Sequence, residues 1–153
     1  MINTWVYSPG EQAKFWQENL ESGEMCIGWG DIGDLKNFAS KDEIQKALPL
    51  LFGDDKERKN DVLALWQFSR EMQIGDIVYA KCGIYKIIGC GVVTGKYQFD
   101  AKRGEFSNVR KVTWNVVGEW NNIAFQMPRK TLTNITAISE VRDYLQDLIV
   151  GKV

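Results

Sequence analysis

Apolar residues recur along the chain in two periods, and the change from one to the other divides the sequence into two parts. Up to Gly75, apolar residues follow capping and turn residues at roughly helical spacing, between short apolar strands. After Gly75 the pattern becomes β-branched and alternating, which predicts strands joined by tight turns. The expected strands cover residues 2–7, 25–29, 76–81, 84–94, 110–117 and 119–125.

Helices are predicted where a capping residue precedes an apolar face. The four expected starts are Ser8-Pro9, Ser40, Asn60, and either Thr136 or Ser139. Glu43 lies three residues after Ser40 and completes a capping box, while Pro49 is expected to end or kink that helix. Helices inserted among mixed strands predict an α+β fold, a small barrel of five or six strands with three or four flanking helices.

The composition is that of one ordinary globular domain, which we expect to span residues 1–153. Apolar residues make up 44% of the chain and charged residues 25%, so a real core is possible. No apolar run reaches the roughly 18 residues of a membrane span, and the first residues do not resemble a signal peptide. Three scattered cysteines, Cys26, Cys82 and Cys90, favour neither a disulfide framework nor a zinc site, so a cytoplasmic location is expected.

The chain contains no histidine, which limits the chemistry it can perform. Nucleophile–histidine pairs, histidine acid–base catalysis and most catalytic metal sites are removed. Carboxylates and lysines remain, but they show no clear catalytic cluster. We therefore expect a binding domain rather than an enzyme, with no catalytic residue, cofactor or metal.

Charge is distributed unevenly along a chain whose net charge is only −1. Residues 1–75 have a net charge of −5, residues 76–153 a net charge of +4, and the stretch 81–130 a net charge of +6. A basic stretch of this kind can face the phosphates of a nucleic acid, although a solvated sheet edge is also often rich in lysine. Phosphate contacts are predicted at Lys96, Lys102, Arg103 and Arg110.

An ordered series of short motifs carries more information than any one of them. The series runs Trp5-Val6-Tyr7-Ser8-Pro9-Gly10, Ile27-Gly28-Trp29-Gly30-Asp31, Asn60-Asp61, Trp66-Gln67-Phe68, Gly75 to Lys81, Gly89 to Tyr97, and Arg110 to Trp114. Over roughly residues 4–120 it resembles EVE domains of the PUA-like superfamily, of the type found at the N-terminus of McrB-like restriction GTPases.

The resemblance implies a pseudo-barrel related to the YTH fold, which reads a modified base by flipping it into an aromatic pocket. In McrB-like systems such a domain gives specificity for double-stranded DNA with a modified base. An AAA+ GTPase motor then lies in the same chain or complex, and a separate nuclease subunit cuts the DNA. This sequence has no Walker motif, so it corresponds to the reader alone, and methylated adenine and methylated cytosine both fit such a pocket.

The candidate base pocket combines aromatic residues with small and polar ones. Its predicted members are Trp29, Gly30, Asp31, Asn60, Tyr97 and Phe99. Trp29 is the first choice for a wall, because its flanking glycines allow close approach and its position resembles the first cage tryptophan of YTH domains. Tyr97 and Phe99 are the candidates for the second wall. Core packing is the alternative role for the aromatic residues, and turn or capping roles for the polar ones.

Three other functions remain open at the level of the sequence. They are an RNA-binding PUA-like module, an ASCH-type small-molecule hydrolase or ligand-binding domain, and a protein–protein module that uses exposed aromatic residues. The absence of histidine counts against a hydrolase. Only the McrB-like resemblance favours DNA over RNA.

Overall fold

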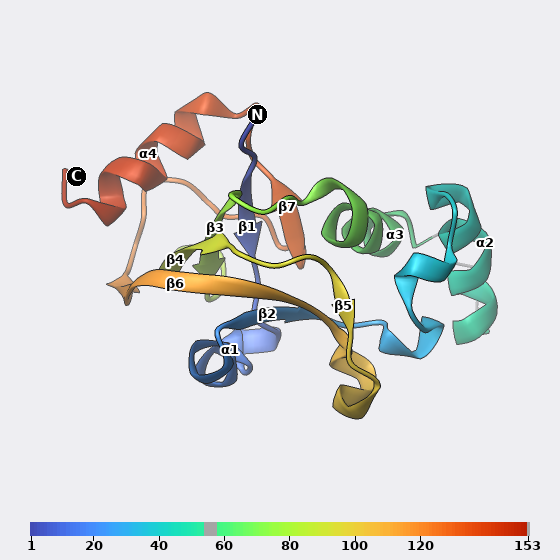
Figure 1. The fold of residues 1–153 in the computed structure, drawn as a ribbon. Helices are drawn as coiled ribbons and strands as arrows, with labels where there is room; N and C mark the ends of the chain where they lie inside the picture. Colours follow the sequence, from blue (N-terminus) through green and yellow to red (C-terminus); the bar gives the residue numbers. More distant parts are fainter. Residues whose placement is uncertain (54–57, 153) are drawn as a thin grey trace.

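The computed structural model describes residues 1–53 and 58–152. Their strands form one curled, mixed β-sheet, and helices flank it (Figure 1). The strand order is β2 (Glu24–Ile27), β6 (Asn108–Trp120), β4 (Ile87–Val93), β3 (Ile77–Lys81), β1 (Thr4–Tyr7) and β7 (Leu132–Asn134), and β5 (Gln98–Phe99) also pairs with β6. Strands β1 and β3 are parallel, and the other paired strands are antiparallel. The long strand β6 pairs with β2 near its start and with β4 along the rest, so it links the two parts of the sheet.

Helices and short helical turns flank this sheet in the described part of the chain. The α-helices are α1 (Trp16–Ser22), α2 (Lys41–Phe52), α3 (Lys59–Trp66) and α4 (Ser139–Ile149). The turns are η1 (Glu11–Ala13), η2 (Gly30–Ile32), η3 (Leu35–Asn37), the π-helical η4 (Gln67–Glu71) and η5 (Ala101–Phe106). In Figure 1, helix α4 lies on one side of the sheet near both termini, whereas α2 and α3 lie beyond the opposite side.

Alternating residues of β1 belong to two separate hydrophobic clusters, as the pleat of a strand requires. Trp5 and Tyr7 are fully buried in the larger cluster, which also contains Leu48 of α2 and Leu65 of α3. Val6 belongs to the smaller cluster, to which α4 contributes. The larger cluster therefore joins the sheet to α2 and α3, and the smaller one holds α4 against the opposite face.

The α+β class and the mixed sheet expected from the sequence are confirmed, although the described residues form seven strands rather than five or six. The two strands that were not predicted, β5 and β7, are two and three residues long, too short for a period-2 pattern to identify them. The strand expected at 110–117 is confirmed, but the separate strand at 119–125 is wrong. Strand β6 continues to Trp120, because Gly118 is held in the ladder between the pairs Gly89–Val117 and Ile87–Trp120, and residues 121–125 are not in a strand.

Helix boundaries also differ from the prediction. Ser40 caps α2, since its Oγ accepts a hydrogen bond from the Glu43 backbone N–H at 3.3 Å, but Glu43 accepts from the Ala39 N–H rather than from that of Ser40, and α2 continues past Pro49. Neither Asn60 nor Ser139 is a cap, because both lie inside their helices, and Thr136 precedes the start of α4. The first regular helix, α1, begins later than the Ser8-Pro9 pattern predicts. Gln12 and Ala13 have positive φ angles of 54° and 57°, which interrupt helical geometry before α1.

Other expectations concern membrane, metal and disulfide sites. No helix among the described residues is long and apolar enough to cross a membrane. The three cysteines are free thiols. Within residues 1–53 and 58–152, no group of three or more cysteine, aspartate or glutamate side chains is placed to hold a metal ion.

Candidate nucleic-acid interface

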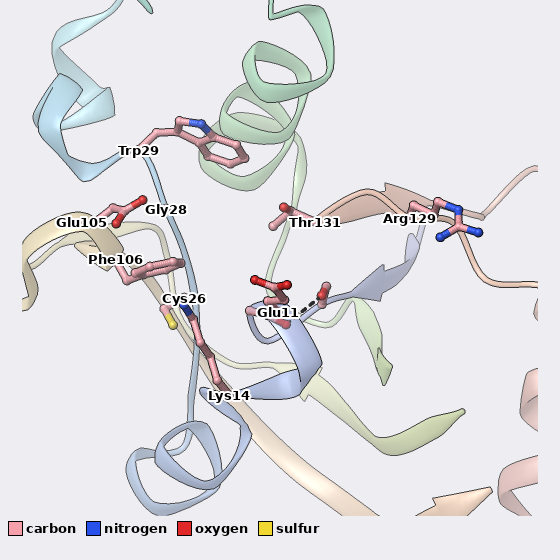
Figure 2. A pocket seen from close by; sticks show the side chains of 11 residues that line it. Glu11, Lys14, Cys26, Gly28, Trp29, Glu105, Phe106, Arg129 and Thr131 are labelled. Atoms are coloured by element: carbon pink, nitrogen blue, oxygen red, sulfur yellow. Dashed lines mark hydrogen bonds between the residues drawn. The ribbon is translucent and has the colours of Figure 1, made fainter. Parts of the chain in front are cut away.

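A cavity of about 430 Å³ opens between the segment after β1, the end of β2 and the loop before β6 (Figure 2). It is lined by Ser8, Gly10, Glu11, Lys14, Cys26, Gly28, Trp29, Glu105, Phe106, Arg129 and Thr131. These residues come from separate segments, so only the folded chain brings them together. The volume lies in the range of roughly 300–1,000 Å³ that is typical of small-molecule sites.

Two aromatic side chains, Trp29 and Phe106, line this first cavity. Trp29 follows β2 and Phe106 ends η5, and Figure 2 shows their rings on different sides of the opening. Phe106 packs against Phe15, whose ring centroid lies 4.3 Å away, and Lys14 Nζ lies 5.8 Å from the Phe106 centroid. Aromatic walls of this kind stack on the flat face of a base.

Trp29 has a left-handed backbone conformation, with φ 60° and ψ 29°, which a bulky residue rarely adopts. Strain of this kind persists only where the surrounding structure enforces it, and it is concentrated at functional sites. Close packing enforces it here: a Cβ added at Gly30 would lie 2.5 Å from the Gly104 carbonyl oxygen. Gln12 and Ala13, in the segment that provides the opposite part of the lining, also have positive φ. Backbone conformations that are unfavourable in free energy therefore occur on both sides of the cavity.

Buried hydrogen bonds fix the segment that carries Trp29. Asn108, at the start of β6, donates from Nδ2 to the Gly28 carbonyl oxygen at 2.8 Å. Its Oδ1 accepts a hydrogen bond from the Tyr97 hydroxyl at 2.7 Å, and that hydroxyl accepts one from the Leu35 backbone N–H at 3.0 Å. Burial raises the pKa of Tyr97 to about 12, so the phenol remains protonated and can donate at neutral pH. Tyr97 and Asn108 together hold the chain before and after Trp29.

Charged side chains of both signs lie around the aromatic pair. Glu11 and Glu105 bring carboxylates to the lining, and Lys14 and Arg129 bring cations. Figure 2 shows the Glu11 carboxylate directed into the space below the Trp29 ring. Among the residues that the structure describes, no hydrogen bond or ion pair engages the side chain of Glu11 or Arg129. Carboxylates can accept hydrogen bonds from a base edge, and the cations can attract phosphates.

A second cavity, of about 300 Å³, adjoins the first and shares Trp29, Arg129 and Thr131 with it. Its other lining residues are Asn60, Asp61, Ala64 and Lys130. The first three of these belong to α3. Figure 2 shows the Trp29 ring between α3 and the first cavity, so this side chain borders both spaces.

The structure brings two of the predicted pocket residues together, because Trp29 and Asn60 both line the second cavity. Gly30 is buried directly after Trp29, where its lack of a side chain lets η2 pack on η5, and it lines neither cavity. Asp31 is exposed on η2 and is also outside both linings.

The structure does not place Tyr97 and Phe99, the predicted second wall, in the lining of either cavity. Tyr97 is only 6% exposed and uses its hydroxyl in the buried network, and Phe99 packs against the larger hydrophobic cluster. Neither lines the two cavities, because both precede η5 and belong to the core side of the sheet. Phe106, at the end of η5, takes the position opposite Trp29 instead.

The four predicted phosphate contacts fall into different environments. Lys96 and Lys102 are exposed, so both stay candidates. Arg103 is half-buried and its Nη1 lies 2.6 Å from Glu24 Oε1, a carboxylate that it shares with Lys111. Arg110 is 5% exposed, and its guanidinium donates to three backbone carbonyl oxygens at 2.7–2.9 Å. The structure therefore contradicts a phosphate contact at Arg110, because the side chain is buried and held by backbone carbonyl groups of the chain itself.

Sequence reasoning missed Phe106, Lys14 and Arg129 as lining residues. The stretch before β6 is rich in polar residues and is typical of an exposed loop, which hides the role of its one inward phenylalanine. Arg129 contributes only to the overall basic charge of residues 81–130. The sequence feature that could have identified this wall is Phe106 itself, an aromatic residue that follows a glycine-containing turn and shortly precedes a strand.

Replacing Glu24 with glutamine is expected to lower the free energy of unfolding by about 1–2 kcal/mol at neutral pH. Burial alone would raise the pKa of Glu24, but the Lys111 hydrogen bond and the Lys111 and Arg103 charges outweigh it and hold the pKa below its ordinary 4.5. Such a carboxylate stabilises the fold above its unfolded-state pKa, and this stability is lost as pH falls through the lower folded-state value.

Urea unfolding of the wild type and Glu24→Gln at pH 7 and pH 3 measures this effect. The advantage of the wild type should shrink at the lower pH, because protonation removes the charge that the variant lacks. Glu71→Gln, at an exposed glutamate, is the matched control and should change stability little at either pH. An advantage that is equal at both pH values would contradict the assignment of the ion pairs.

The lining residues up to Thr131 lie within one family match. A family model described as "Domain of unknown function (DUF8426)" matches residues 5–139. The chain belongs to the DUF8426 family. The match includes Trp29, Phe106 and Arg129, and thus both cavities of this DUF8426 domain. No curated protein matches the sequence.

Solved structures resemble the DUF8426 domain in fold. The complex of the YTH domain-containing protein mmi1 with RNA has a TM-score of 0.51 at 8% identity, covering 96% of this chain and 80% of that chain. The YTH domain of Zygosaccharomyces rouxii MRB1 protein in complex with N6-methyladenosine RNA has a TM-score of 0.48 at 11% identity, covering 94% and 86%. Protein Atu2648 from Agrobacterium tumefaciens has a TM-score of 0.45 at 12% identity, covering 94% and 92%. The likeness to mmi1 confirms the YTH-related fold predicted from the sequence.

Proposed function

We propose that this DUF8426 domain binds a nucleic acid through one modified base, which it holds in the first cavity between Trp29 and Phe106. The observation that carries this proposal is the cavity itself, in which two aromatic side chains from separate segments meet carboxylates and cations. A base inside a duplex cannot be enclosed, so it must be extruded at a cost of a few kcal/mol. Stacking returns about 1–3 kcal/mol per base, which offsets much of that cost.

The carboxylates of the first cavity favour a base with an exocyclic amino group. Glu11 and Glu105 accept hydrogen bonds when ionised, so they suit the N–H donors of adenine N6 and cytosine N4. A methyl group on either base adds apolar surface that the aromatic walls can cover, worth about 0.8 kcal/mol when fully buried. The modification is therefore proposed to be methylated adenine or methylated cytosine.

We propose DNA as the polymer and an McrB-like restriction system as the setting, because the ordered motifs from Trp5 to Trp114 resemble EVE domains of that type. The partner is then double-stranded DNA with a modified base, and the GTPase motor and nuclease belong to other domains or subunits. The domain itself binds and does not catalyse, in keeping with its lack of histidine. The proposed phosphate contacts are Lys14 and Arg129 at the cavity, Lys102 within η5, and Lys96, which precedes η5 in the sequence.

RNA binding is the second candidate function, because the fold neighbour mmi1 is described as a complex with RNA. The first cavity would hold a modified base of RNA by the same stacking and edge contacts. The two polymers differ in the 2′-hydroxyl and in helix geometry, so affinity for matched strands separates the candidates.

A binding panel at fixed salt tests the proposed function. Duplexes and single strands of DNA and RNA each carry one N6-methyladenine, 5-methylcytosine or 5-hydroxymethylcytosine, and each is compared with its unmodified counterpart. One modification is expected to bind more tightly than the unmodified base, by a factor of about 4 from burial of the methyl group and by about 10- to 100-fold at most, the limit for one small apolar group. Equal affinity across the whole panel would contradict a base-reading pocket, and tighter binding of RNA would replace DNA as the polymer.

A further inference from the structure

Trp29 lines two adjoining cavities, and the proposed function uses only one of them. The second cavity lies between Trp29 and α3 and is lined by Asn60, Asp61 and Ala64 of that helix. A tryptophan has two π-faces, and each can stack on a separate base. The second cavity therefore has an aromatic wall already in place, held by the same backbone strain and buried hydrogen bonds as the first.

The remaining lining of the second cavity is suited to a nucleotide. Ala64 gives an apolar surface, and the Asn60 side chain offers both a hydrogen-bond donor and an acceptor for a base edge. Asn60 is exposed, and in the described part of the chain no hydrogen bond engages its amide. The volume of about 300 Å³ is smaller than that of the first cavity but lies within the range of ligand sites.

Cations lie where the two cavities meet. Arg129 lines both spaces and Lys130 lines the second. Both side chains are exposed, and no ion pair neutralises either of them among the described residues. A phosphate group that bridges two nucleotides would find its counter-charge at this junction.

We infer that the domain holds two consecutive nucleotides of one strand, the modified one in the first cavity and its neighbour in the second, with Trp29 between the two bases. This inference rests on the proposed function and extends it. It requires that the strand be unpaired at both positions, so the preferred ligand is a single strand or a locally opened duplex. It also gives Asn60 the role of contacting the neighbouring base rather than the modified one.

Single-stranded pentanucleotides with N6-methyladenine or 5-methylcytosine at the centre test the inference, as DNA and as RNA. An abasic residue is placed either directly before or directly after the modified base, and affinity is measured by calorimetry at fixed salt. On one side the abasic residue is expected to weaken binding by a factor of about 5 or more, because one stacking contact is lost. On the other side the effect should be small.

Variants connect this effect to the second cavity. In Asn60→Ala, the intact strand should bind more weakly and the penalty for the abasic neighbour should shrink. In Lys130→Gln, the intact and abasic strands should weaken by a similar factor, because an abasic residue keeps its phosphate. Asn37→Ala and Lys46→Gln replace exposed residues of the same types outside both cavities and should keep the full penalty. An abasic neighbour without effect on either side, or a penalty unchanged in Asn60→Ala, would overturn the inference.

The modified nucleoside alone distinguishes failure of this inference from failure of the proposed function. A nucleoside fills only the first cavity, so its preference over the unmodified nucleoside depends on that cavity. A preserved nucleoside preference without a neighbour effect rejects only the second site. A nucleoside that binds no better than its unmodified form, together with equal binding of all pentanucleotides, rejects both.

Discussion

Replacing Arg110 with alanine is expected to lower the free energy of unfolding by about 3–5 kcal/mol, with little specific effect on nucleic-acid affinity. The guanidinium donates to the carbonyl oxygens of Phe68, Met72 and Gly95, so alanine leaves three acceptors without their donor. Burial lowers the pKa of Arg110 to about 10, against the opposing effect of Asp76, so the group is still charged at neutral pH. The charged guanidinium of Arg110 therefore stabilises the fold rather than binding a ligand.

Chemical denaturation of Arg110→Ala, with binding measured on the folded protein, checks this expectation. Arg129→Ala is the matched control, because it removes an exposed arginine and should change stability by less than about 0.5 kcal/mol. A variant of Arg110 that keeps wild-type stability and loses affinity in proportion to one phosphate contact would restore the original prediction from the sequence.

The burial of Arg110 was readable from the strand pattern. Side chains two residues apart point to the same face of a strand, and the apolar residues Val112 and Trp114 alternate with polar ones in this segment of the sequence. Arg110 shares their face, whereas Lys111 and Thr113 are exposed on the other. Total charge concealed this distinction, because a count of basic residues over 81–130 treats inward and outward positions alike.

The two walls of the first cavity differ in how far the sequence specifies them. Trp29 was predictable because glycines flank it at the end of a short apolar strand, a local signal. Phe106 was not, because its place opposite Trp29 depends on η5 packing against Gly30 and on Phe15 packing against its ring. These contacts join segments far apart in the chain. Asn60 was predicted to cap a helix, but it lies inside α3, and only the tertiary fold places it beside Trp29.

The residues mistaken for ligand contacts share a positioning role. Tyr97 holds Asn108 and Leu35 on either side of the Trp29 segment, and Arg103 ties η5 to Glu24 of β2. Both therefore fix the walls without touching the space between them. A site built on loops becomes precise only through such supporting contacts. Polar and aromatic types alone did not separate the supporting residues from the lining ones.

Replacing Trp29 with alanine is expected to weaken binding of the modified strand by about 1–3 kcal/mol, a factor of about 5 to 150. Phe106→Ala should have an effect in the same direction, since it removes the other wall. Unmodified duplex, which is held mainly through phosphates, should lose much less. Trp29 is only partly buried, so most of the effect should fall on affinity rather than on folding.

Thermal melting and binding on the same samples separate a wall from a core residue, since loss of a core tryptophan costs about 3–5 kcal/mol of stability. Trp29→Gly is the second variant, because glycine adopts the left-handed backbone at this position without strain and so protects the fold. Trp66→Ala is the matched control, a partly buried tryptophan packed on the same cluster but outside both cavities. It should keep the preference for the modified base even if it melts earlier. A Trp29→Gly protein that stays folded and keeps that preference would remove Trp29 from the site, and with it the second cavity as a place for the neighbouring base.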